Sequence, residues 1–495
     1  MNGAELLLGS QALARHGNRT ALICGEQSLS FTELAGRVAR AAGAFAALGV
    51  RPGERVLLLM RDTPDFAVAW LGAVRAGAVA VALNEKLSDA ELHHAAADST
   101  PRLAIVDEEF AHRRFAAVEP IAASTYAEKA HRAAAAPAFD AVPETPAFML
   151  YSSGTTGAPK GIVHAHRSFA ALGFAFRCIG LRAGERVLST SKYFFAYGLE
   201  HGLLATLAHG ATALAYPGWP DADAVIELVE RHHPNAIFSV PTIYRRLLAQ
   251  PRGRLARFGA TRLFVAAGER LSKQLVDQWR RTVGGELLNL YGMSETFCAC
   301  MMTPPGSSDG MRTGVPFEGV QVELRDSSGK PPAPNEPGVL WIRHPAQAAG
   351  YANLPRETQE QFRDGWFCSR DLFVRDSHGY YIHQGRSDEL LKVAGQWVQP
   401  GELEAVAAQE PAVSEAACVP VPDADGLERL ALFVTASADP AAARRAAEQA
   451  CERLLPRHKR PKWVRAVDEL PRTATGKVQR FKLREILERE LSAKD

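Results

Sequence analysis

The sequence is poor in cysteine, with only seven cysteines among its 495 residues. Cys298 and Cys300 are the one close pair, and no second cluster of ligand residues accompanies them at metal-binding spacing. A structural zinc site and a disulfide framework are therefore not expected, and this cysteine usage fits a reducing cytoplasm.

Long apolar runs and a strong excess of one charge are also missing. No window approaches the roughly 18 uncharged apolar residues of a membrane span, and residues 1–8 lack the basic segment and length of a signal peptide. The formal net charge of +2 gives no electrostatic reason to expect nucleic acid or an anionic membrane as a partner. These absences predict a soluble cytoplasmic protein that acts on small molecules.

The composition that remains is that of a large globular protein, with 47% hydrophobic and 23% charged residues. A chain of this length exceeds one hydrophobic core, so at least two domains are expected. Strand-like and helix-like segments alternate over residues 30–106 and again over 186–290. Because such alternation is typical of parallel sheets covered by helices, we expect a large N-terminal α/β domain of stacked layers.

Caps and hydrophobic spacing predict individual elements. Ser30 with Glu33, and Ser88 with Glu91, have the spacing of capping boxes at helix N-termini. Further helices are expected over residues 65–76, 223–233, 242–250 and 273–283. Strands are expected over residues 55–60, 78–83, 103–106, 147–150, 186–190, 236–240, 263–266 and 286–290. Residues 129–146, rich in alanine and proline, are expected to form a surface connection.

The pattern changes near residue 312. Paired strand-like segments around turn residues predict a β-rich subdomain, over 320–325 with 339–343 and over 372–374 with 380–383. Beyond residue 386 a small α+β domain is expected, with strands over 416–421, 431–435 and 463–466 and helices over 441–455 and 481–491. The expected domains are 1–386 and 387–495.

The most distinctive polar segment is the glycine loop at residues 151–161, YSSGTTGAPKG, which follows an apolar strand. Its hydroxyls and approachable backbone N–H groups suit phosphate oxygens, and Lys160 adds a mobile positive charge. The loop is not a Walker A sequence, because Gly161 stands where a serine or threonine should follow the lysine. By itself the loop predicts only phosphate binding.

Four further polar clusters carry candidate chemistry. Residues 291–296, YGMSET, end a predicted strand at the edge where parallel sheets place ligands. Glu295 offers the hard oxygen that Mg²⁺ prefers, and Ser294 can donate to a phosphate. The carboxylate of Asp371 can accept both hydroxyls of a ribose. The other two clusters are 385–389 and 471–477. Taken singly, YGMSET would more often be a turn with a solvated glutamate, and Asp371 and Lys477 would more often be solvated surface charges.

In this order the five clusters resemble those of the AMP-forming acyl-CoA synthetases of the adenylate-forming superfamily, over nearly the whole chain. The resemblance implies a large N-terminal domain and a small mobile C-terminal domain that turns about a hinge near Asp388. It implies that a carboxylate first attacks the α-phosphate of ATP to give acyl-AMP and pyrophosphate. A thiol then displaces AMP to give a thioester. ATP, Mg²⁺ and coenzyme A are the implied cofactors and co-substrate of a monomer or homodimer.

The resemblance also assigns residues. Lys477 is implied to bridge the carboxylate and phosphate oxygens, Ser294 to touch the phosphate, and Glu295 to hold Mg²⁺. The implied nucleotide- and CoA-binding residues are Ser152, Ser153, Gly154, Thr155, Thr156, Gly157, Lys160, Tyr291, Gly292, Asp371, Arg386, Lys392 and Gly395. For Gly395, a structural turn glycine remains an alternative.

For the acid, residues 191–199, SKYFFAYGL, and 397–400, WVQP, resemble segments of benzoate-type CoA ligases. The aspartate that binds an amino-acid ammonium in other relatives is missing, which argues against an amino acid. The implied pocket residues are Ala196, Tyr197, Ala266, Ala267, Gly268, Met293, Cys298 and Ala299. Cys298-Ala299 replace a histidine and a bulky aliphatic residue of the benzoate-type pattern, which favours a ring-substituted benzoate or a larger aryl acid. For Phe194 and Phe195, core packing is favoured over substrate contact.

We therefore predict ATP-dependent conversion of benzoate or a ring-substituted benzoate to acyl-AMP and then to aryl-CoA, as used in aromatic degradation. The alternatives are a ligase for medium-chain fatty acids or cinnamate-like acids, and a non-catalytic nucleotide-binding relative. The joint presence of Glu295, Asp371, Arg386 and Lys477 argues against the non-catalytic relative.

Overall fold

The computed structural model places the chain in two compact units. The first comprises Met1–Glu323, Trp341–Cys368 and His378–Tyr381, and the second Leu324–Leu340, Ser369–Ser377 and Ile382–Asp495. The residues described are 1–115, 118–152, 159–389, 391–393, 396–423, 426–436, 438–472 and 478–492. Within them, no helix combines the length and the apolar character that crossing a membrane requires.

A seven-stranded sheet of the first unit leads into the glycine loop. Its strand order is β18-β8-β7-β4-β3-β5-β6. The strands are β3 (Arg55–Leu59), β4 (Val79–Ala82), β5 (Leu103–Val106), β6 (Pro120–Ala122), β7 (Pro146–Ser152), β8 (Lys160–Ala165) and β18 (Gly350–Tyr351). The central strands β4 and β5 are entirely buried and rich in valine, leucine and alanine, as expected of parallel strands covered on both faces. Strands β7 and β8 pair antiparallel, so both ends of the glycine loop lie side by side.

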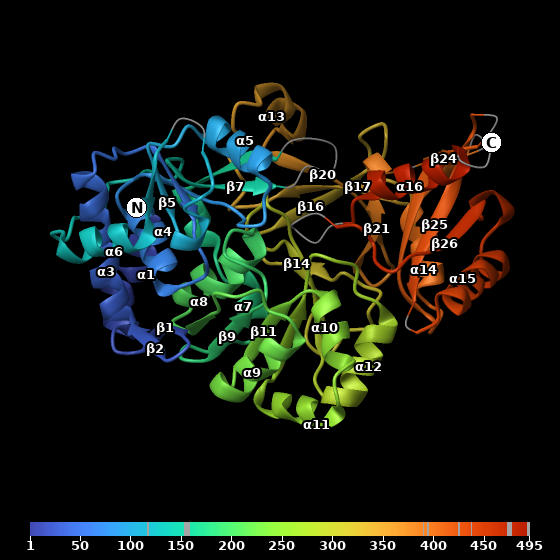
Figure 1. Ribbon diagram of the computed structural model, residues 1–495, viewed down its shortest axis with the longest axis horizontal. Helices are drawn as coiled ribbons and strands as arrows, with labels where there is room; N and C mark the ends of the chain where they lie inside the picture. The colour runs from blue at the N-terminus through green and yellow to red at the C-terminus, as the bar shows by residue number, and fades with distance from the viewer. Residues whose placement is uncertain are drawn as a thin grey trace. The chain divides into compact units, whose positions relative to one another are not determined.

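A nine-stranded sheet completes the core of the first unit, with strand order β15-β14-β13-β12-β11-β9-β10-β1-β2. Figure 1 labels its strands β1, β2, β9, β11 and β14. Its strands are β1 (Thr20–Cys24), β2 (Gln27–Ser30), β9 (Arg186–Ser189), β10 (Thr212–Ala215), β11 (Ala236–Ser239), β12 (Leu263–Ala266), β13 (Leu287–Tyr291), β14 (Met301–Met302) and β15 (Val315–Pro316). The strands β1, β10, β9, β11, β12 and β13 run parallel. Their carboxyl ends therefore share one edge, where such sheets bind ligands.

Helices flank both sheets of the first unit. They are α1 (Gly3–Leu8), α2 (Ser10–His16), α3 (Phe31–Ala47), α4 (Pro64–Arg75), α5 (Asp89–Ser99), α6 (Ala123–Arg132), α7 (Phe174–Cys178), α8 (Ala205–Ala208), α9 (Ala222–His232), α10 (Pro241–Leu248), α11 (Arg252–Leu255), α12 (Lys273–Val283) and α13 (Pro355–Gln361). A π-helical segment, η3 (Gly198–Leu204), precedes α8. Both predicted capping boxes are present, with the Ser30 and Ser88 side chains accepting from the backbone N–H of Glu33 and Glu91.

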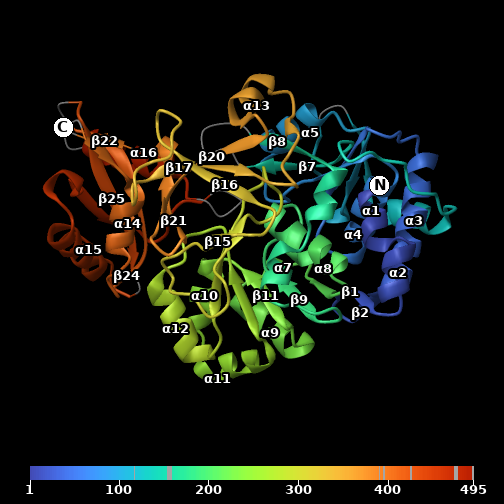
Figure 2. The same ribbon diagram turned by 180° about the vertical axis from the view of Figure 1, so that it is seen from behind.

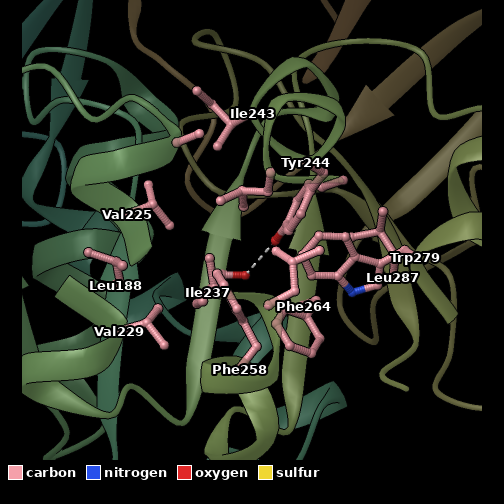
Figure 3. Close-up of a cluster of buried hydrophobic side chains, with 14 of the residues drawn as sticks. Leu188, Val225, Val229, Ile237, Ile243, Tyr244, Phe258, Phe264, Trp279 and Leu287 are labelled. Atoms are coloured by element: carbon pink, nitrogen blue, oxygen red, sulfur yellow. Dashed lines mark hydrogen bonds between the residues drawn. The ribbon is translucent and has the colours of Figure 1, made fainter. Parts of the chain in front are cut away.

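One large hydrophobic cluster fixes α9, α10 and α12 against the nine-stranded sheet (Figure 3). The rings of Tyr244 and Trp279 meet edge to face at 4.8 Å. Tyr244 also donates its hydroxyl to the backbone oxygen of Ile237 in β11, at 3.0 Å, so this buried polar atom is satisfied. The packing holds β11 and β12 rigidly beneath the site described below.

The second unit is built around a three-stranded sheet of β24 (Val413–Pro422), β25 (Glu428–Ala436) and β26 (Trp463–Ala466). Alternate residues of β25 enter different clusters, because successive side chains of a strand point to opposite faces. Leu432 packs with α14 (Pro400–Ala407) and α15 (Pro440–Leu454), whereas Phe433 packs with α16 (Arg480–Ser492). Figure 2 shows α14 and α16 on opposite faces of the sheet.

Further strands occur where the chain passes between the two units. They are β16 (Gln321–Arg325), β17 (Gly338–Arg343), β19 (Phe362–Arg363), β20 (Trp366–Arg375) and β21 (Tyr381–Arg386), followed by the antiparallel pair β22 (Leu391–Val393) and β23 (Gln396–Val398). The predicted fold class, a large α/β part with a β-rich portion and a smaller α+β part, is confirmed. The boundary at 386/387 stays a prediction. The predicted connection 129–146 is wrong at its start, since α6 continues to Arg132.

Candidate functional site

The predicted YGMSET cluster opens a tight loop, residues 292–300, at the carboxyl end of β13. The backbone N–H of Cys300 donates to the oxygen of Tyr291 at 2.8 Å, which closes the loop at its base. A side chain at Gly292 would be crowded, because its Cβ atom would lie 3.0 Å from the Cα atom of Ala299. The loop therefore projects from the ligand-binding edge of the nine-stranded sheet.

His164 of β8 joins this loop to the other sheet of the first unit. Its Nε2 lies 2.8 Å from the backbone oxygen of Ser294, and its ring stacks on Phe148 at 4.8 Å. Burial lowers the pKa of His164 to about 3, so the ring is neutral and Nε2 carries the proton that Ser294 accepts. Sequence reasoning missed this residue, although a histidine within an apolar strand next to the glycine loop is the kind of signal that could have marked it.

Phe297 shapes the turn that follows Ser294. Its φ of 54° lies in the left-handed region, which costs a non-glycine residue about 1–2 kcal/mol. Its ring packs against Phe148 at 4.7 Å and His164 at 5.4 Å. This aromatic packing offsets the backbone strain and holds the turn in one conformation.

Glu295 and Lys160, two predicted site residues, meet around Tyr351 of β18. The Tyr351 hydroxyl donates to Glu295 Oε1 at 3.0 Å, and Lys160 Nζ lies 5.4 Å from the centre of the Tyr351 ring. The backbone oxygen of Glu295 accepts from the N–H of Ala348 at 2.8 Å. Glu295 is therefore held at both its main chain and its side chain, with one lysine nearby.

At the far end of the loop, two hydrogen bonds hold the backbone of Ala299. Its backbone N–H donates to Glu200 Oε2 at 3.1 Å, and its backbone oxygen accepts from His344 Nε2 at 3.3 Å. The second ring nitrogen of His344 accepts from the N–H of Ala346 at 2.9 Å, which fixes the tautomer. The thiol of Cys298 lies beside the Glu200 carboxyl group. Neither Glu200 nor His344 was predicted.

Tyr197, Ala266 and Ala267, three further pocket candidates, lie at the ends of β11 and β12. The Tyr197 hydroxyl donates to the backbone oxygens of Ser239 and Val265, both at 3.3 Å. Ala266 ends β12, and the N–H of Ala267 donates to the oxygen of Ser239. Cys298, Ala299, Ala266 and Ala267 are buried, Ala196, Tyr197 and Met293 are half-buried, and Gly268 is exposed. The structure thus brings Tyr197 and Ala266–Ala267 to the same strand ends.

Three other predicted residues form one cluster in the second unit. Arg386 donates to both carboxylate oxygens of Asp388 at 2.8 Å, and its Nη1 lies 3.5 Å from Asp371 Oδ1. Burial alone would raise the pKa of Asp388, but hydrogen bonding and charge from Arg386, aided by Arg370, bring it below its ordinary value. The predicted hinge residue is therefore an ionised partner of a predicted nucleotide-binding arginine.

Several predicted residues lie outside the described part of the chain, namely Ser153, Gly154, Thr155, Thr156, Gly157, Gly395 and Lys477. For Lys392 only the backbone, in β22, is described. At the edges of the glycine loop, Ser152 of β7 lies directly opposite Lys160 of β8.

Among the described residues, no group of three or more histidine, cysteine, aspartate or glutamate side chains is arranged to hold a metal ion. A single tethered carboxylate, Glu295, suits Mg²⁺, which keeps water and takes its other oxygens from substrate phosphates. The residues present therefore fit a metal that arrives with a nucleotide.

Comparison with known proteins identifies the family of this chain. The model of the AMP-binding enzyme family matches residues 10–352, and that of the AMP-binding enzyme C-terminal domain matches residues 402–477. The chain is 38% identical to a 3-hydroxybenzoate–CoA/4-hydroxybenzoate–CoA ligase of Thauera aromatica, over 99% of this chain and 98% of the relative. It is 39% identical to a 3-hydroxybenzoate–CoA ligase of Aromatoleum sp. (strain CIB), over 98% and 97%.

A solved benzoate CoA ligase from Burkholderia xenovorans LB400 superimposes with a TM-score of 0.90 at 33% identity, covering 98% of this chain and 100% of that one. Both the match over the whole length and the family models bear out the resemblance found in the sequence. The chain belongs to the family of AMP-binding enzymes and, within the adenylate-forming superfamily, to the aryl-CoA ligases.

Proposed function

We propose that this aryl-CoA ligase activates a hydroxybenzoate. The observation that carries the proposal is the similarity, over nearly the whole chain, to two ligases whose names specify hydroxybenzoates. Cys298 and Ala299 also support it, since these small side chains leave more room beside the ring than the histidine and bulky aliphatic of the benzoate-type pattern. Fatty acids and cinnamate-like acids are less supported.

The first half-reaction joins two anions, so the α-phosphate needs positive charge and hydrogen-bond donors around it. In our proposal Lys477 bridges the attacking carboxylate and the α-phosphate, and its flexible stem follows both oxygens as the bond forms. Ser294 donates to the phosphate, Lys160 and the glycine loop bind the departing pyrophosphate, and Asp371 binds the ribose hydroxyls. The carbonyl that His164 holds keeps Ser294 in place.

Glu295 is proposed as the protein ligand of Mg²⁺. Bound there, the ion would neutralise phosphate charge. The Tyr351 hydroxyl occupies one direction around Glu295 Oε1 and so restricts how the carboxylate can turn.

For the second half-reaction we propose that residues 387–495 form a mobile domain that turns about Asp388. The departure of Lys477 from the α-phosphate and the arrival of Gly395 beside the pantetheine chain of CoA would separate the two steps in time. A side chain at position 395 would obstruct that chain.

The substrate proposal is tested by measuring AMP release with ATP, Mg²⁺ and CoA across a panel of acids. The panel holds 3-hydroxybenzoate, 4-hydroxybenzoate, benzoate, a cinnamate, a medium-chain fatty acid and an amino acid. We expect the highest kcat/KM for a hydroxybenzoate. A larger kcat/KM for benzoate or for the fatty acid would reject the proposed substrate while leaving the ligase assignment intact.

The role of Lys477 is tested by separating the half-reactions. We expect Lys477→Ala to lower acid-dependent pyrophosphate exchange by about a thousandfold, since it removes the cation at the reacting oxygens. Thioester formation from supplied acyl-AMP should be largely retained. Equal loss in both half-reactions would contradict the assigned role.

A further inference from the structure

Two adjacent polar side chains, Glu200 and His201, are buried within the π-helical segment η3. Each is only 1% exposed, and the segment follows directly after the pocket candidate Tyr197. π-Helical turns are rare and are frequently found at functional sites. Neither side chain has a place in the two half-reactions, so their burial needs another reason.

Glu200 is held in a protonated, neutral form. Burial raises the pKa of its carboxyl group to about 8, against the smaller opposing effects of hydrogen bonds from the Ala299 N–H and the Cys298 thiol. Oε2 accepts from the N–H of Ala299, whereas Oε1 has no hydrogen-bond partner among the described residues. A neutral carboxyl group therefore offers a buried hydroxyl donor that no described protein group accepts.

His201 offers the complementary acceptor. Burial lowers its pKa to about 3, and Nδ1 lies 3.2 Å from the backbone oxygen of Tyr197, so Nδ1 carries the ring proton. The ring stacks on Phe238 at 4.7 Å and therefore has little freedom to turn. Nε2 is left with a lone pair and no partner among the described residues.

An unpaired buried polar atom costs roughly 1–3 kcal/mol, so each of these two atoms calls for an explanation such as a bound ligand or a water molecule. A phenolic hydroxyl is both an acceptor and a donor. It can accept from the Glu200 carboxyl and donate to His201 Nε2, which benzoate cannot do.

The pair also lies against the acid site. Glu200 contacts Ala299 and Cys298, and the His201 ring lies 5.0 Å from that of Tyr197. These are three of the predicted pocket residues. We propose that Glu200 and His201 together recognise a hydroxyl group on the aromatic ring and so select hydroxybenzoates over benzoate. This inference rests on the proposed function and names the residues that would produce its selectivity.

The test compares kcat/KM for 3-hydroxybenzoate, 4-hydroxybenzoate and benzoate between the wild-type enzyme and single variants. His201→Phe keeps an aromatic ring against Phe238 but has no acceptor, and Glu200→Leu removes the donor. For the better hydroxybenzoate we expect its kcat/KM relative to benzoate to fall by about tenfold to a hundredfold in each variant. The hydroxybenzoate isomer whose kcat/KM relative to benzoate falls more identifies the ring position of the hydroxyl group that Glu200 and His201 bind.

His344→Phe is the matched control. His344 is also a buried neutral histidine that contacts Ala299, but both its nitrogens have partners. It should change kcat/KM for all three acids by similar factors. Calorimetric binding of each acid to the wild-type enzyme adds a readout that does not depend on the folding of Glu200→Leu, and should give tighter binding of the better hydroxybenzoate.

The outcomes separate the two proposals. If the wild-type enzyme prefers a hydroxybenzoate but His201→Phe lowers all three kcat/KM values equally, the pair is structural and this inference is overturned. If the wild-type enzyme prefers benzoate, the proposed function itself fails and the inference falls with it. Tight binding of benzoate and hydroxybenzoates alike would also overturn the inference, because a filled water site would then explain the unpaired atoms.

Discussion

At the scale of single residues, burial decides protonation around the loop 292–300. His164 and His344 are neutral because burial lowers their pKa values to about 3 and about 4, and Glu200 is neutral because burial raises its pKa to about 8. Neutral hydrogen bonds thus hold the loop without placing fixed charge beside the reacting anions. In the proposed mechanism, the positive charge that catalysis needs comes from Lys160, Lys477 and Mg²⁺.

Glu200 should make the folded protein less stable as pH rises, whereas a salt-bridged carboxylate makes it less stable as pH falls. The unfolded chain loses this proton near the ordinary pKa of 4.5, whereas the folded chain keeps it until about pH 8. Folding stability from this group is therefore lost as pH rises between those values. We expect Glu200→Gln to raise the free energy of unfolding relative to wild type by an amount that grows from pH 5 to pH 8, reaching roughly 2–4 kcal/mol.

Urea unfolding at pH 5, 6, 7 and 8 measures this difference. Glu227→Gln is the control, because Glu227 is exposed and pairs with Arg231 one helical turn away. Its difference from wild type should stay flat across the series. A flat series for Glu200→Gln would mean that Glu200 is ionised in the folded protein.

Tyr351 should govern how well Glu295 serves as a metal ligand. Tyr351→Phe removes the hydroxyl that donates to Glu295 Oε1 but keeps the ring beside Lys160. We expect the Mg²⁺ concentration for half-maximal activity to rise by about tenfold, as is usual when the partner of a metal ligand is lost. Tyr126→Phe is the control, since the hydroxyl of Tyr126 donates to Ala41 in α3. An unchanged Mg²⁺ requirement for Tyr351→Phe would remove Glu295 as the proposed ligand or Tyr351 as its support.

At the scale of elements, the loop 292–300 is held in one conformation by hydrogen bonds from distant parts of the chain. β8 supplies His164, η3 supplies Glu200, and the segment after β17 supplies His344 and Ala348. Because the tethers bind backbone atoms, the positions of Ser294 and Glu295 depend on residues that share no local pattern with them.

His164→Phe tests whether these hydrogen bonds position the loop 292–300 for catalysis. Phenylalanine keeps the stacking on Phe148 but leaves the oxygen of Ser294 without its donor. We expect kcat for pyrophosphate exchange to fall by about tenfold or more, because small displacements of positioning groups are costly. His166→Phe is the matched control, since buried His166 accepts instead from the N–H of Gly3 in α1. It should lower thermal stability without a comparable loss of kcat, and equal losses in kcat would contradict a special role for His164.

The sequence predicted elements well where local chemistry decides them. The helix expected over 273–283 has the bounds of α12, and both capping boxes formed, because caps and apolar spacing act over a few residues. The π-helical segment η3 and the tethers from His164, Glu200 and His344 were missed. They depend on contacts between residues up to 130 positions apart, such as His164 with Ser294, and no short pattern encodes such contacts.

At the scale of the whole molecule, the candidate site residues are divided between two units. Lys160, Ser294 and Glu295 belong to the first, whereas Asp371, Arg386 and Asp388 belong to the second. Arg386 is shared between Asp371, proposed to bind ribose, and Asp388, proposed as the hinge. If a bound nucleotide drew Arg386 toward its phosphate, the ion pair between Arg386 and Asp388 would weaken. Nucleotide binding would then be coupled to the conformation of the proposed hinge.

Asp388→Pro tests that hinge in the intact enzyme. Proline fixes φ near −65°, so it should hinder the backbone rotation that we propose precedes thioester formation. We expect thioester formation from supplied acyl-AMP to slow by at least about tenfold more than pyrophosphate exchange does. Asp388→Asn loses the charge that binds Arg386 but keeps backbone freedom, and therefore separates the loss of the ion pair from the locking of φ.

If Asp388→Asn slowed thioester formation as much as Asp388→Pro, the ion pair and not the rotation would limit the second step. If neither variant changed the second step relative to the first, position 388 would not be the hinge. A selective effect of proline alone is what a turning domain requires, because proline restricts the backbone at position 388 whereas asparagine leaves it free to rotate.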